Sequence, residues 1–163
     1  MTTHLSRTRN QNPDLDLSIH RVIRAPKQAL WDAWTTPDRL AQWSIPAPLQ
    51  LRVDSLELAP GGAFVTQMSE DGTEWHPHVD AVFLVIEEGS RLVFTNAVSS
   101  SWRPALPDPV AMTTEIILGD HPDGIDYQAI VRHGSPEQRA RHEELGFFDG
   151  WGTVTDQLAA AVE

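Results

Sequence analysis

The chain has no cysteine among its 163 residues. Disulfide bonds, thiolate nucleophiles and cysteine-ligated metals are therefore excluded, and we expect a cytoplasmic protein. The sequence also lacks any apolar run near the 18 residues of a membrane-spanning helix, and the polar stretch 1–12 has no apolar core of a secretory signal. We therefore expect neither secretion nor a membrane partner.

Basic residues are scarce: 12 lysines and arginines stand against 23 aspartates and glutamates, which gives a net charge of −11. Nucleic acids and anionic membranes are bound mainly through cationic side chains, so neither is an expected partner. Hydrophobic residues make up 40% of the chain, enough for a substantial core. The length and composition predict one domain over residues 15–163, preceded by a disordered tail over residues 1–14.

Tryptophan, by contrast, is abundant, with six residues, and aromatic side chains gather near the end of the chain. Residues 146–151 combine two phenylalanines and a tryptophan with Gly146 and Gly150 in a stretch that otherwise has a helical pattern. Glycine inside a helix costs about 1 kcal/mol relative to alanine, so these two predict close packing against the helix backbone. Such an aromatic helix either closes a core or caps a pocket.

Hydrophobic periodicity predicts an α+β fold with most strands consecutive. Two short helices follow the first strand, one opening at 25–26 and one running from 36–38 to Trp43, and one long helix is predicted from 136 to 161. Because the long helix is the only large element left, we expect it to cover the concave face of a curved antiparallel sheet. The predicted strands span residues 15–24, 49–58, 63–68, 74–86, 91–98, 112–118 and 125–133.

Several short segments in this order resemble one known family. They are RAP at 24–26, LWDAWTTP at 30–37, LAQW at 40–43, APGGAF at 59–64, RLVFTN at 91–96 and GFFDGW at 146–151. Together they resemble the branch of the START/Bet v 1-like (SRPBCC) superfamily that is named after the activator of Hsp90 ATPase homologue 1. The resemblance covers about residues 16–162 and implies the helix-grip fold, in which a curved sheet wraps around a long C-terminal helix.

The same resemblance bears on partners. The family often has a glycine and an aromatic residue in its long central strand, where this sequence has Ala81 and Phe83. The cochaperones that name the family have an additional N-terminal domain that makes much of the chaperone contact. We expect no such domain in 163 residues, and therefore no chaperone partner.

The favoured function is the binding of a small hydrophobic or amphipathic molecule between the sheet and the C-terminal helix, without a cofactor. Asn96 or a tryptophan indole would orient it, and Trp102, on a loop rich in serine and proline, is either a lid or a loop anchor. A simple packed core is an equal alternative. Besides Trp102 and Thr114, the predicted lining is Trp34, Trp43, Phe64, Met68, Phe83, Phe94, Asn96, Met112, Phe147, Phe148 and Trp151.

A metal site is the first alternative. His76, His78 and Asp80 alternate along one strand, and two histidines with a carboxylate suit a metal. Pro77 indicates an edge or a bulge, however, and the alternation places the three on the face opposite Phe83. A solvated strand face is therefore the better interpretation, and we predict no metal.

Two further functions stay open. A cyclase-like or hydrolase-like enzyme would need a perturbed acid or base in the cavity, for which Glu74, Asp80, Glu115 and Tyr127 are candidates by position. None lies in a recognisable motif, so we assign no catalytic residue. A cochaperone-like interaction module is the other alternative. A bare sheet edge also makes a homodimer possible.

Overall fold

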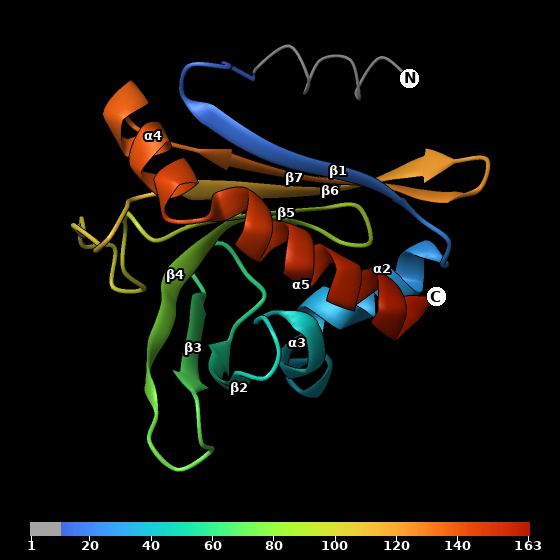
Figure 1. The fold of residues 1–163 in the computed structure, drawn as a ribbon, viewed down its shortest axis with the longest axis horizontal. Helices are drawn as coiled ribbons and strands as arrows, with labels where there is room; N and C mark the ends of the chain where they lie inside the picture. The colour runs from blue at the N-terminus through green and yellow to red at the C-terminus, as the bar shows by residue number, and fades with distance from the viewer. Residues whose placement is uncertain (1–10) are drawn as a thin grey trace.

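A computed structural model describes residues 11–163, and Figure 1 shows one curved sheet crossed by a C-terminal helix. The seven strands are all antiparallel, in the order β1-β7-β6-β5-β4-β3-β2. The predicted α+β helix-grip fold is therefore confirmed. The elements are β1 (Asp16–Ile23), α2 (Lys27–Thr35), α3 (Pro37–Trp43), β2 (Gln50–Leu56), β3 (Ala63–Ser69), β4 (His76–Glu87), β5 (Arg91–Thr95), β6 (Thr113–His121), β7 (Gly124–Arg132), α4 (Pro136–Glu144) and α5 (Phe147–Val162).

The strand register separates the two faces of the sheet. Phe94, Thr114, Val131 and Leu17 lie side by side across β5, β6, β7 and β1. Leu17 and Val131 pack against Phe147 of α5, so this row belongs to the face that the helix covers. Because side chains alternate along a strand, the neighbouring residues, including Glu115, point to the opposite face.

The two short helices begin where the prolines predict. Pro26 precedes the first residue of α2, and Pro37 opens α3. The Trp43 indole donates a 3.0 Å hydrogen bond to the carbonyl oxygen of Ala33, which ties the two helices together. Both helices contact α5 near its C-terminal end, as Figure 1 also shows.

The prediction of one continuous helix over 136–161 is wrong. Gly146 has a φ of +94°, in the left-handed region that glycine adopts at no steric cost, and it separates α4 from α5. The Ser135 hydroxyl accepts a hydrogen bond from Gln138 N–H, so the predicted N-cap is present. The break lets α4 and α5 take different directions over the sheet (Figure 1).

The prediction of close packing at the glycines is wrong as well. A Cβ atom built at Gly146, Gly150 or Gly152 meets no heavy atom within 4 Å. Gly146 serves the helix break, whereas Gly150 and Gly152 have ordinary negative φ and leave open space beside α5. Missing side chains, rather than a close neighbour, distinguish this part of the helix.

The remaining differences concern element ends. β4 begins at His76 rather than at residue 74, and β5 ends at Thr95 rather than at residue 98. Of the predicted tail, residues 1–10 lie outside the described residues, and Asn12 accepts two backbone hydrogen bonds in a turn before β1. Within residues 11–163, no helix has both the length and the apolar character that crossing a membrane requires.

Candidate functional site

A cavity of about 280 Å³ lies between the covered face of the sheet and the helices. It receives residues from α2, α3, α4 and α5 and from β2, β3, β4 and β5, but none from β1, β6 or β7. Most of its wall is apolar or aromatic. The lining residues are Trp34, Leu40, Trp43, Ser44, Pro46, Leu51, Phe64, Thr66, His78, Val79, Phe94, Met112, His142, Gly150, Trp151 and Val154.

Aromatic rings form a rigid part of this wall. The ring centroids of Trp34 and Trp43 lie 4.9 Å apart in an edge-on arrangement, and those of Phe64 and Phe94 lie 5.0 Å apart, also edge-on. The Trp34 indole donates to the Tyr127 hydroxyl at 3.2 Å, and the Trp43 indole is used by α2. These two indoles therefore present ring surface to the cavity, and their N–H groups are committed elsewhere.

The polar part of the wall is small. Thr66 and His78 lie next to each other, with 3.0 Å between the Thr66 hydroxyl and His78 Nδ1. Desolvation of the imidazole lowers the pKa of His78 below its usual value, although the residue as a whole is still exposed. His142 of α4 supplies the other imidazole. Burial, followed by the nearby His133, lowers the pKa of His142 to about 4, so both cavity imidazoles favour the neutral form.

Six of the thirteen predicted lining residues line this cavity: Trp34, Trp43, Phe64, Phe94, Met112 and Trp151. Phe83 and Phe147 are buried in the core outside it, with the Phe83 ring stacked on Phe64 at 5.3 Å. Met68 also lies outside the lining, towards the end of β3. Phe148 points to the surface and is 47% exposed.

Asn96 and Trp102, which were predicted to contact a ligand, instead hold the loop between β5 and β6 in place. The Asn96 amide donates to the carbonyl oxygen of Val110 at 3.1 Å and accepts from Met112 N–H at 2.8 Å, so it holds backbone. Trp102 is 62% exposed, and its ring packs on Gly61, where a Cβ atom would lie closer to the indole than van der Waals contact allows. Neither residue lines the cavity of about 280 Å³, although Asn96 lines a smaller one that shares His78 and Phe94 with it, and the Trp102 contact is that of a loop anchor.

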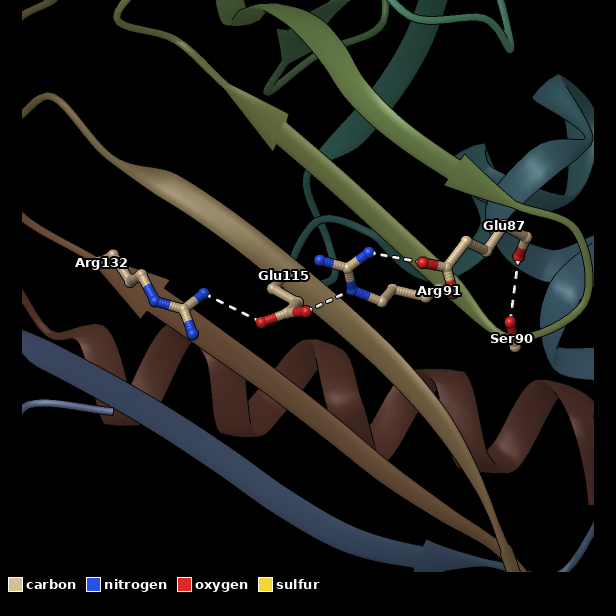
Figure 2. Close-up of polar contacts among 5 residues, drawn as sticks. All are labelled: Glu87, Ser90, Arg91, Glu115 and Arg132. Atoms are coloured by element: carbon tan, nitrogen blue, oxygen red, sulfur yellow. Dashed lines mark hydrogen bonds and ion pairs between the residues drawn. The ribbon is translucent and has the colours of Figure 1, made fainter. Parts of the chain in front are cut away.

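Glu115, an acid–base candidate, lies on the wrong face for the cavity. Figure 2 shows it on β6 between Arg91 and Arg132, with Arg91 continuing to Glu87. Arg132 Nη1 lies 3.0 Å from Glu115 Oε1, and Arg91 bonds the other oxygen. Desolvation opposes ionisation, but the two guanidinium groups outweigh it and lower the carboxyl pKa. Glu115 is therefore an ionised structural group.

The other acid–base and metal candidates do not form a catalytic or metal site either. Tyr127 is fully buried, which raises its hydroxyl pKa, and Glu74 and Asp80 are exposed and do not line the cavity of about 280 Å³. In the described part of the chain, no three histidine, aspartate or glutamate side chains gather closely enough to hold a metal ion.

His76, His78 and Asp80 are exposed, as expected for a solvated strand face, but His78 differs from the prediction because it also lines the cavity. Thr66 pairs with Val79 and Gln67 pairs with Pro77, so the strand carries a bulge at His78. The bulge brings His78 and Val79 together into the cavity wall, opposite Thr66. Pro77 was the signal for this bulge, although it did not tell in which direction the imidazole points.

His142 and Gly150 are cavity residues that sequence reasoning missed. On one continuous helix, residues nine positions apart, such as His142 and Trp151, lie on opposite faces, because each residue turns the helix by about 100°. The break at Gly146 brings both to one cavity. Basic residues in the last turn followed by glycine are the usual signal of a helix end, and Arg141, His142 and Gly146 fit it.

A curved antiparallel sheet that grips C-terminal helices around an apolar cavity defines the helix-grip class of the START/Bet v 1-like superfamily. The profile of the family "Activator of Hsp90 ATPase homolog 1-like protein" matches residues 24–163. The chain belongs to this family. No curated protein matches the chain.

Solved structures agree with this assignment. A protein from Nitrosomonas europaea is 35% identical, with a TM-score of 0.81, over 93% of this chain and 96% of that one. The AHSA1-like protein from Aeromonas hydrophila is 21% identical, with a TM-score of 0.61, over 90% and 91%. A protein from Mycobacterium smegmatis is 19% identical, with a TM-score of 0.75, over 92% and 91%. The last two likenesses concern the fold alone.

Proposed function

We propose that this protein binds a small apolar or amphipathic molecule, without covalent chemistry, in the cavity between the sheet and α5. The observation that carries the proposal is the cavity itself: about 280 Å³, walled mainly by aromatic and aliphatic side chains, with four polar side chains, Ser44, Thr66, His78 and His142. Ligand pockets usually measure about 300–1,000 Å³ and have this composition, so the occupant is a small molecule.

Desolvation of the ligand supplies most of the binding energy. A ligand the size of an aromatic side chain buries about 150–250 Å². At about 25 cal/mol per Å², this corresponds to about 4–6 kcal/mol before the cost of association. The aromatic contacts between α2, α3 and the sheet hold the wall in place, so little ordering is required on binding.

The glycines of α5 offer a test with a matched control. Gly150 lines the cavity and has open space where a Cβ atom would be, so the ring of Gly150→Phe should occupy the cavity. Gly152 has the same open space but does not line the cavity, so Gly152→Phe is the control. Both changes replace a poor helix former with a better one, so both variants should fold.

The measurement is a titration with beta-methylnaphthalene, followed by heteronuclear NMR of the tryptophan indole signals. Trp34, Trp43 and Trp151 line the cavity, and we expect their signals to shift, whereas that of Trp102 stays in place. Binding should weaken at least tenfold in Gly150→Phe and stay unchanged in Gly152→Phe. Equal affinity in both variants, or shifts confined to Trp102, would refute the proposed site.

A further inference from the structure

Two hydrogen-bonded histidines connect the cavity to the backbone of Leu15, the residue before β1. His133, directly after β7, is 6% exposed, and its Nδ1 lies 2.8 Å from the carbonyl oxygen of Leu15. Its Nε2 lies 2.8 Å from Nδ1 of His142 on α4. His142 is a cavity residue, so this chain of hydrogen bonds ends at the cavity wall.

The Leu15 carbonyl oxygen, at one end of these hydrogen bonds, determines which nitrogen of each imidazole carries a hydrogen. A carbonyl oxygen only accepts, so the Nδ1 of His133 carries the hydrogen and donates it to Leu15. In a neutral imidazole the other nitrogen is then an acceptor, and His133 Nε2 receives the hydrogen of His142 Nδ1. The Nε2 of His142 is therefore left with a lone pair. The lowered pKa of His142 keeps this ring neutral at pH 7.

The surroundings leave that nitrogen without a partner. The His142 ring meets Phe147 edge-on, with centroids 5.1 Å apart, and no residue among 11–163 bonds its Nε2. Elsewhere on the wall, His78 is held by Thr66, and the Trp34 indole is used inside the protein. His142 lines the cavity, and Nε2 is its one ring nitrogen without a partner among residues 11–163, so it is the acceptor that this ring can offer to a ligand.

We propose that the cavity selects amphipathic molecules with a hydroxyl or N–H donor, such as phenols and alcohols, which donate this hydrogen to Nε2 of His142. His133 is the positioning residue, because its bond to Leu15 fixes which nitrogen of His142 is free. The inference rests on the proposed function and deepens it. A site that accepts a hydrogen bond rejects an analogue that cannot donate one far more strongly than an apolar wall discriminates by size.

An isosteric pair of probes tests this on the unmodified protein. Beta-naphthol and beta-methylnaphthalene differ in a hydroxyl against a methyl group. We expect beta-naphthol to bind at least tenfold more tightly. Equal affinities that are both lost in Gly150→Phe would overturn the hydrogen-bond inference and leave the proposed function standing. Absence of binding by both probes would overturn the two together.

Two variants test whether His142 is the residue that accepts the hydrogen bond from beta-naphthol. In His142→Phe the preference for beta-naphthol should disappear while beta-methylnaphthalene still binds. In His78→Phe, the control that removes the other cavity imidazole, the preference should remain. If the preference follows His78 instead, the assignment to His142 is wrong.

The tautomer gives a readout that does not depend on a ligand or on any substitution. Heteronuclear NMR of the imidazole nitrogens distinguishes a protonated from an unprotonated ring nitrogen. We expect the hydrogen on Nδ1 in both His133 and His142 of the unmodified protein at neutral pH. In His133→Phe this bias on His142 should be lost, together with the preference for beta-naphthol. A hydrogen on Nε2 of His142 in the unmodified protein would overturn the inference.

Discussion

Gly150 and Gly152 weaken α5 without an evident packing need, and replacing them tests this directly. Glycine costs a helix interior about 1 kcal/mol relative to alanine, and a methyl group at either position meets no atom within 4 Å. We therefore expect Gly150→Ala and Gly152→Ala each to raise the free energy of unfolding by about 0.5–1 kcal/mol. Residues two apart on a helix do not face each other, so the double variant should gain about 1–2 kcal/mol.

The assay is denaturant unfolding followed by circular dichroism, with the slope against denaturant unchanged. For a chain of this size, about 1 kcal/mol corresponds to a rise of about 2–4 °C in Tm. Gly146→Ala is the contrasting variant: with φ at +94°, it should lose about 1 kcal/mol. If Gly150→Ala instead destabilises the protein by 1 kcal/mol or more, something packs against the helix backbone there and the open space is not real.

Three further predictions concern the wall, the opposite face and the loop. The pKa of His142 in the folded protein is about 4, below its ordinary 6.5, so the stability that its neutral form contributes above pH 6.5 is lost as the pH falls towards 4. In His142→Phe, the free energy of unfolding should therefore depend less on pH between 6.5 and 4. Glu115→Gln should cost about 1–3 kcal/mol in denaturant unfolding but leave probe binding unchanged, because it lies on the other face. Asn96→Ala removes two hydrogen bonds and should cost about 1–3 kcal/mol, measured as a lower Tm.

Regular parts of the chain were predictable because one physical signal dominates each. Alternating apolar residues in 112–118 and 125–133 correctly gave the β6–β7 pair, and Pro26 and Pro37 marked helix starts. Trp34 and Trp43 were predicted as lining residues because helical spacing places them on the side that packs against the rest of the chain. The cavity contains both.

Irregular positions were not predictable in the same way. Periodicity assigns a face only while the repeat continues, and the bulge at His78 and the break at Gly146 both reset it. Asn96 was correctly predicted to need a partner, but sequence cannot tell that the backbone of a loop sixteen residues further on supplies it. Phe147 and Phe148 are adjacent, and only the start of α5 decides that one is buried and the other exposed.

The cavity lies where these departures from regular structure meet. A bulge brings His78 to the cavity, a helix break brings His142, and Gly150 leaves the volume of a side chain unfilled in the same lining. Each departure weakens local structure, and a chain under pressure for stability alone gains by removing them. Gly150 distinguishes a binding cavity from loose packing: an alanine there should stabilise α5, whereas a phenylalanine should stabilise the helix and weaken binding at least tenfold. A cavity that exists only as loose packing predicts the first effect without the second.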